Sequence, residues 1–164
     1  MSKTEIRILT VIFAAVLCLA TVTFHVSQKT QTATGRFRVP ARETEMIQGN
    51  PQQIEEKLHY QTVDLAEGFK IALCGRPQIG NDRELVLYLT SMKENDVWIR
   101  AVVYNEQKQQ LGSTGVLYPG EWVENIPLDT PVENGQTVII KIISYQPETY
   151  YSKGSADIKV NVQK

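Results

Sequence analysis

Residues 156–163 read ADIKVNVQ, an unbroken alternation of apolar and polar side chains. Successive side chains of a β-strand point to opposite faces of a sheet, so a period of two predicts a strand. The apolar set is expected to face a core and the polar set to face water, as in a sheet that is buried on one side only. This stretch therefore predicts a strand that packs one face on the core of an all-β domain.

Six further segments upstream have the same character and are separated by turn signals. They are rich in β-branched and aromatic residues or alternate in polarity, and they cover residues 69–74, 85–90, 97–104, 111–117, 122–128 and 138–145. Seven short strands at close spacing predict an Ig-like antiparallel β-sandwich over residues 63–164. The Cys…Trp…Cys spacing of antibody domains is absent from the sequence.

Two of the connections carry specific turn chemistry. The tetrapeptide Tyr118-Pro119-Gly120-Glu121 places Pro second and Gly third, the order that a type II turn requires because its third residue has a positive φ. Asn134-Gly135 is a turn signal ahead of the long strand at residues 138–145. Both turns are expected to serve the fold before any function.

The N-terminal part of the chain contains an apolar run. Residues Ile8–Val26 (ILTVIFAAVLCLATVTFHV) include no Asp, Glu, Lys or Arg. As a helix the run would extend about 28 Å, close to the hydrocarbon thickness of a bilayer. Residues 1–26 are therefore predicted to be a tail and a single transmembrane anchor. A cleaved signal peptide is the alternative, but no A-x-A cleavage site follows the run.

The predicted orientation of this anchor rests on the lengths of the segments before and after it, and not on their charge. Basic residues flank the run on both sides, so the positive-inside rule gives no direction. A minimal tail before a large folded part favours the arrangement of a signal-anchor in the cell membrane, with the C-terminal domain on the extracytoplasmic side.

Residues 27–62 are predicted to join the anchor to the sandwich as a polar tether that ends in a short helix. Residues 27–49 are polar and contain Gly and Pro. Asn50 is a good N-cap, and Pro51 suits the first helical position. Ile54 and Leu58 are four residues apart and would share one face, so a helix is expected over about 51–60.

The composition and charge of the chain argue against a nucleic-acid partner. The chain is 42% hydrophobic and 21% charged, an ordinary globular mixture, with a formal net charge of −1. Residues 63–164 hold 10 Lys and Arg against 13 Asp and Glu. A nucleic-acid-binding domain would need a clustered basic face, and this mildly acidic segment predicts none.

Few residues are candidates for catalysis or metal binding. Cys74 is expected to be a small buried core residue, because free cysteines are usually buried. His59 has no second His at metal-ligand spacing and is expected at the surface. The sequence contains no recognisable catalytic or nucleotide-binding motif, so neither an enzyme nor a cofactor is expected. A cupredoxin-like domain that handles a solute or metal is the alternative function, and it rests on fold similarity alone.

Aromatic residues near turns are the candidate partner-binding residues. Trp98 and Trp122 are more typical of core or half-core positions, and the carboxylates beside Trp122 are expected at a solvated edge. The candidate residues are Tyr118, Glu121, Trp122, Tyr150 and Tyr151.

Three stretches of the sequence are distinctive in combination. They are Asn50-Pro51 with Ile54 and Leu58 and then Glu67-Gly68, Glu84-Leu85-Val86-Leu87 with Val97 and Ile99, and LYPGEWVE at residues 117–124 with the terminal VNVQ. Together they resemble a group of small, largely uncharacterised membrane-anchored proteins of Gram-positive bacteria. The resemblance covers about residues 50–164 and implies a membrane-tethered β-sandwich without catalytic residues to carry over. The expected function is a non-catalytic extracytoplasmic interaction module in an envelope, secretion, transfer or surface-assembly complex, with a protein partner.

Overall fold

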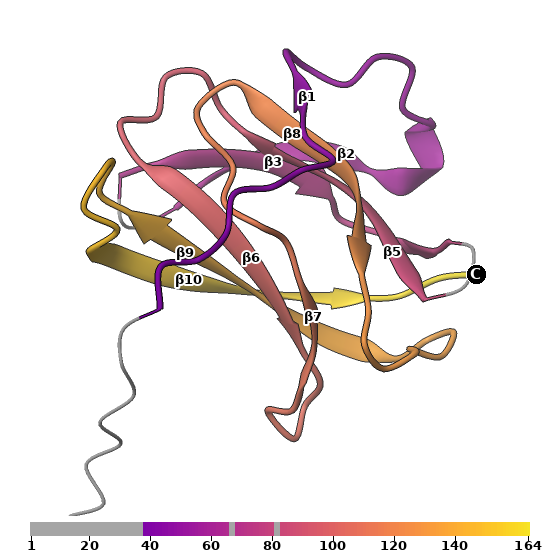
Figure 1. The fold of residues 1–164 in the computed structure, drawn as a ribbon. Coiled ribbons are helices and arrows are strands. Elements are labelled where there is room, and N and C mark those ends of the chain that lie inside the picture. Colours follow the sequence, from indigo (N-terminus) through magenta and orange to yellow (C-terminus); the bar gives the residue numbers. More distant parts are fainter. Residues whose placement is uncertain (1–37, 66–67, 81–82) are drawn as a thin grey trace, which may run out of the picture. The chain divides into compact units, whose positions relative to one another are not determined.

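A computed structural model describes residues 38–65, 68–80 and 83–164. The compact unit Val39–Lys164 contains two antiparallel β-sheets, and its fold is a β-sandwich (Figure 1). The larger sheet contains, in spatial order, β1 (Ile47–Gln48), β8 (Glu121–Pro127), β5 (Glu84–Ser91), β3 (Lys70–Cys74) and β2 (Tyr60–Asp64), with β4 (Gln78–Ile79) also pairing with β5. The smaller sheet contains β10 (Ser152–Asn161), β9 (Thr137–Tyr145), β6 (Trp98–Tyr104) and β7 (Gln110–Ser113).

The all-β prediction is confirmed, and each of the seven expected segments contains a strand. Two boundaries differ by four residues. β10 begins at Ser152 and not at residue 156, and β7 ends at Ser113 although the apolar pattern continues to Leu117. Leu117 makes an isolated bridge with Ile99, so the chain rejoins β6 after a short break. The pattern indicates burial at residues 116–117, and both are buried, but they lie outside the named strand.

The core lies between the two sheets and follows the period-two alternation. Leu85, Leu87 and Leu89 of β5 are fully buried, as are Ile140 and Ile142 of β9. Burial of such side chains contributes about 1.5–3 kcal/mol each and supplies most of the cohesion between the sheets.

The last strand has the predicted two-faced character. Asp157 and Lys159 of β10 are exposed, whereas Ala156 and Ile158 are half-buried and Val160 is buried. The alternation on which the sequence prediction rests is therefore confirmed.

The predicted helix over residues 51–60 is wrong in length and type. The structure has only a single 3₁₀ turn, η1 (Glu56–Leu58), without a side-chain cap. His59 follows in the left-handed region with φ 51°, and β2 begins at the next residue and pairs with β3. Pairing of β2 and burial of Leu58 override a local helix preference that amounts to tenths of a kcal/mol per residue.

The segment predicted as tether also contains strands. β1 and the first residues of β2 lie before residue 63, the predicted start of the sandwich. Each of these strands lies at an edge of the larger sheet, and most of their residues are exposed. Hydrophobic alternation cannot reveal strands that bury so little.

No helix in the described residues is long and apolar enough to span a membrane. The predicted anchor Ile8–Val26 and the first part of the tether, residues 27–37, lie outside the described residues.

Candidate interaction surface

Three connections gather at one end of the sandwich, which we name the loop end: residues 92–97, 118–120 and 146–151. The register explains this, because Trp98 at the start of β6 pairs with Tyr145 at the end of β9. The backbone N–H of Gly120 donates to the carbonyl oxygen of Ser91 at 2.8 Å and holds the second connection there. An ion pair of 3.2 Å joins Asp96 of the first connection to Lys153 near the start of β10, just after the third connection.

The turn at residues 118–121 has the predicted type II character. Gly120 has φ +80°, and the Glu121 N–H donates to the Tyr118 carbonyl oxygen at 3.1 Å. A Cβ atom on Gly120 would meet only the Lys93 side chain, at ordinary contact distances of 3.9 Å. Glycine is thus required here by the backbone angle and not by lack of space.

An aromatic cluster covers this end, formed by Trp98, Tyr118, Tyr145 and Tyr150. Trp98 and Tyr118 are stacked with ring centroids 4.1 Å apart, and Tyr150 meets Trp98 edge-on at 5.1 Å. Tyr145 lies 6.3 Å from Tyr150. Such pairs contribute about 0.5–1.5 kcal/mol beyond the area that they bury. The cluster therefore gives the loop end a rigid base.

The guanidinium of Arg42 closes the cluster on one side. Its Cζ lies 3.5 Å from the centroid of the Tyr118 ring. Trp98 stacks on the same ring, so the two must occupy its opposite faces. Burial lowers the pKa of Arg42, but contacts with Tyr118 and with the Glu121 carboxylate raise it by more, so the net pKa lies above its usual value. Both faces of Tyr118 are therefore occupied from within the chain.

Glu121 is a buried carboxylate, which corrects the expectation of a solvated edge. Its side chain is 2% exposed and forms an ion pair with Arg42. It accepts further hydrogen bonds from Gln48 Nε2 and from the Tyr118 backbone N–H, each at 2.8 Å. A buried charge persists only when it is paired and hydrogen-bonded, and these three donors meet that need. Glu124, the other carboxylate beside Trp122, is exposed as expected.

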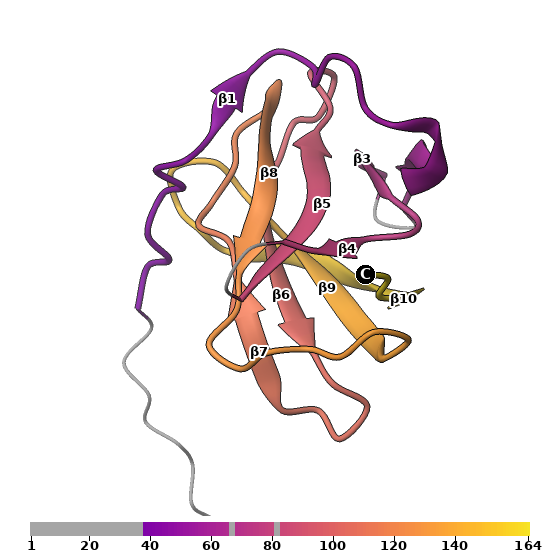
Figure 2. The ribbon, with the colours of Figure 1, turned by 90° about the vertical axis from the view of Figure 1, so that its right-hand side faces the viewer.

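Arg42 and Gln48 belong to a segment that we name the strap, residues 39–49. The strap begins beside Val116, whose N–H donates to the Ala41 carbonyl oxygen at 2.9 Å. It ends as β1, which pairs with β8 (Figure 2). Since Val116 adjoins the smaller sheet and β8 belongs to the larger one, the strap joins both sheets along one side of the sandwich.

Gly115 makes this docking possible. Its N–H donates to a carboxylate oxygen of Glu43 at 2.6 Å. A Cβ atom at this position would overlap the backbone of Glu43 and Arg42. Only glycine permits so close an approach of two backbones.

The candidate residues therefore have different environments. Tyr118 and Glu121 are held by the strap, and Tyr150 is half-buried in the cluster. Trp122 is buried and stacks instead on Tyr88 at 5.9 Å. Among the five candidate residues, only Tyr151 is largely exposed, with 72% of its surface accessible at the loop end.

Sequence reasoning missed Arg42 and Gln48 because both lie in a polar segment more than 70 residues before Glu121. No local periodicity marks such a contact. The Tyr-Pro-Gly-Glu turn identifies one half of the arrangement, and one of three arginines in the predicted tether gives no signal for the other half.

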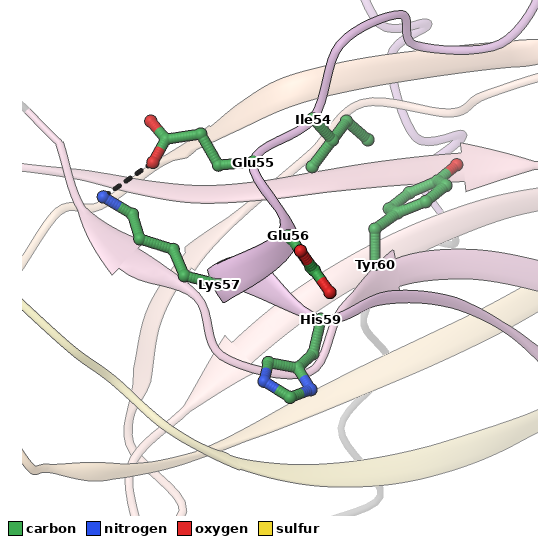
Figure 3. Close-up of a pocket in the computed structure, with 6 residues that line it drawn as sticks. All are labelled: Ile54, Glu55, Glu56, Lys57, His59 and Tyr60. Atoms are coloured by element: carbon green, nitrogen blue, oxygen red, sulfur yellow. Dashed lines mark ion pairs between the residues drawn. The ribbon is translucent and has the colours of Figure 1, made fainter.

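A surface hollow of about 710 Å³ lies around η1 (Figure 3). Glu55 and Lys57 form an ion pair of 2.7 Å on its rim, and the rings of His59 and Tyr60 point in opposite directions. The Tyr60 hydroxyl shares a hydrogen bond of 2.7 Å with the Thr90 hydroxyl in the sandwich. His59 is exposed, as predicted.

Cys74 is fully buried and free, which confirms the core role predicted for it. Burial raises the pKa of its thiol from 9.0 to about 11, so the reactive thiolate is disfavoured. Within residues 38–65, 68–80 and 83–164, no three His, Cys, Asp or Glu side chains gather as metal ligands would.

Comparison with known proteins leaves the chain without an assigned family. No protein-family model matches the sequence, and no curated protein gives a significant match.

Proposed function

We propose that this chain is a membrane-anchored, extracytoplasmic interaction module that contacts a protein partner through its loop end. The observation that carries the proposal is the exposure of Tyr151, which directly follows Tyr150 of the aromatic cluster in the chain. Tyrosine suits this role because it offers a large contact area at a low cost in conformational entropy. Exposed aromatic residues on loops are also enriched among residues that dominate binding energy.

The strand order supports an Ig-like assignment within the β-sandwich class. β3, β5 and β8 follow one another in one sheet, and β7, β6, β9 and β10 do so in the other. This matches strands A-B-E and C′-C-F-G of Ig-like domains, in which β5–β6 and β9–β10 correspond to B–C and F–G. Loops of this kind form the antigen-binding end of variable domains, so the position of Tyr151 is one that this architecture uses for recognition.

The anchoring part of the proposal rests on the apolar run Ile8–Val26 and on the resemblance to small anchored proteins of Gram-positive bacteria. Full-length protein is expected to remain with membranes after alkaline carbonate washing. Protease added to intact protoplasts is expected to digest the domain. A soluble product that starts after residue 26, or protection of the domain in protoplasts, would contradict this part.

The binding surface can be tested by photocrosslinking in native cells. A photoreactive amino acid replaces Tyr151 in the full-length chain, and a matched variant carries it at Asn134, an exposed turn residue at the other end of β9. A discrete crosslinked protein is expected with the first variant and not with the second. Equal crosslinking from both positions, or none from position 151, would overturn the proposal.

A further inference from the structure

We infer that the free edge of β10 pairs with β10 of a second copy of this chain, in an antiparallel arrangement centred on Ile158. β10 is the outermost strand of the smaller sheet and pairs only with β9 among the strands that the structure describes (Figure 1). Ten residues make it the longest of these strands. An edge of this length presents backbone donors and acceptors to any strand that can approach it.

The direction of the backbone groups follows from one hydrogen-bonded pair. Ile99 and Leu117 exchange both backbone hydrogen bonds, at 2.9 and 2.8 Å, so Ile99 faces away from β9. Alternate residues of a strand bond to opposite neighbours. In β9 the residues paired with Ile99 and its alternates therefore bond to β10, as the register of β6 with β9 shows. The register of β9 with β10 then leaves the backbone groups of alternate β10 residues pointing outward, those of Ser155, Asp157, Lys159 and Asn161.

The continuation of this edge already accepts a strand. Gln163 has the same outward direction, and its N–H donates to the Pro77 carbonyl oxygen at 2.8 Å. Its carbonyl oxygen accepts from the Ile79 N–H at 2.9 Å. The edge is therefore geometrically fit for pairing, and the segment at residues 77–79 limits the free part to residues 155–161.

Charge selects the register. Pairing centred on Ile158 places Asp157 of each copy opposite Lys159 of the other, and both residues are exposed. Centring on residue 157 would place two aspartates opposite each other, and centring on residue 159 would do the same with two lysines. Opposite charges across a strand pair are favourable and like charges are unfavourable, so the two-fold pairing at Ile158 is preferred.

The apolar face of the strand agrees with this register. Ile158 packs against the core but remains half-buried at the edge. In the pairing it would meet Ile158 of the second copy, and Ala156 would meet Val160. Each contact extends the sandwich core across the new strand pair.

The first test uses disulfide formation in the full-length chain, purified in detergent, with Cys18→Ser as background. Ile158→Cys places two thiols across the two-fold axis at a Cα separation of about 4.5 Å, within the range for a disulfide. Ala156→Cys is the matched control on the same face, where the two Cα atoms would be about 14 Å apart along the strand direction. A covalent dimer is expected only with Ile158→Cys. Efficient crosslinking of both variants, or of neither, would overturn the inference.

The second test measures the dimer dissociation constant by analytical ultracentrifugation. Asp157→Lys and Lys159→Asp are each expected to weaken the dimer roughly tenfold, because two favourable pairs become two unfavourable ones. The combined exchange restores the pairs and is expected to restore the affinity. A monomeric wild-type chain would overturn the inference, and so would a dimer whose dissociation constant is unchanged by either single substitution. Tyr151→Ala is expected to leave the dimer unchanged, so this result is separable from the proposed partner contact.

Discussion

The sandwich and the strap are held by different forces. The sandwich buries apolar side chains from two sheets, among them Ile140 and Leu87 at 0% exposure. The strap contributes mainly backbone hydrogen bonds and the ion pair between Arg42 and Glu121. A hydrogen bond adds about 1 kcal/mol net, whereas ordering one backbone residue costs about 1–2 kcal/mol. The strap is therefore expected to detach before the sandwich unfolds, and the following variants test that difference.

The largest effect is expected in the sandwich core. Ile140→Ala should lower the free energy of unfolding by about 2–5 kcal/mol, because it leaves a cavity among packed side chains. Ile139→Ala, on the opposite face of β9 and only half-buried, is the matched control and should cost much less. Chemical denaturation of both variants measures the difference. Equal losses would show that the two faces of β9 are not distinguished by burial.

The strap should respond most strongly to loss of its charge. Arg42→Met is expected to lower the free energy of unfolding by about 3 kcal/mol, because the Glu121 carboxylate loses its cation and can regain water only when the strap detaches. Arg76→Met, at an exposed position, is the control and should be nearly neutral. Thermal melts give the comparison. A neutral Arg42→Met would mean that water replaces the guanidinium without loss.

Gly115→Ala should release the strap by sterics alone. Amide exchange at Glu43 and Gly49, which donate to Val116 and Gly120, is expected to accelerate while exchange in β9 stays slow. The loss of stability should resemble that of Arg42→Met, since both variants end with the strap detached and Glu121 open to water.

The double variant sharpens this prediction. Combining Gly115→Ala with Arg42→Met should cost little more than either change alone, because a detached strap can be released only once. Additive losses in a double-mutant cycle would show that the two residues act independently.

A smaller effect is expected at the turn of the loop end. Gly120→Val should destabilise the domain by on the order of 1–3 kcal/mol, through a positive φ that a β-branched residue adopts poorly. Gly120→Asn should cost less, because Asn tolerates this region better. The melting temperatures of the wild type and the two variants give the comparison. An unchanged value for Gly120→Val would contradict a purely conformational role for this glycine.

The last effect concerns pH and vanishes near neutrality. The pKa of the Cys74 thiol is about 11 in the fold, against 9.0 for an ordinary thiol. Between these values the unfolded state loses its proton and the folded state keeps it, so stability should fall as the pH rises from about 9 to about 11. Burial also raises the pKa of Tyr60, so Cys74→Ala is the necessary reference. Identical pH profiles for wild type and Cys74→Ala would contradict the assignment to this thiol.

The sequence by itself determined seven of the ten strands in the described residues, the two-faced last strand, the buried Cys74 and the type II turn at Gly120. Each of these features depends on neighbouring residues in the sequence, either through an alternation of period two or through a residue that suits one backbone angle. Such signals survive without knowledge of the rest of the chain.

Only the tertiary structure decided the strap and the fate of the candidate site. From the sequence alone Glu121 is expected at the surface. In the structure it is buried, because Arg42 and Gln48 of the strap bind its carboxylate. Tyr118 likewise loses both ring faces to residues that are not its neighbours in sequence, and only Tyr151 remains exposed. Long-range polar contacts involve single residues without periodicity, so their effect on burial appears only when the chain is folded.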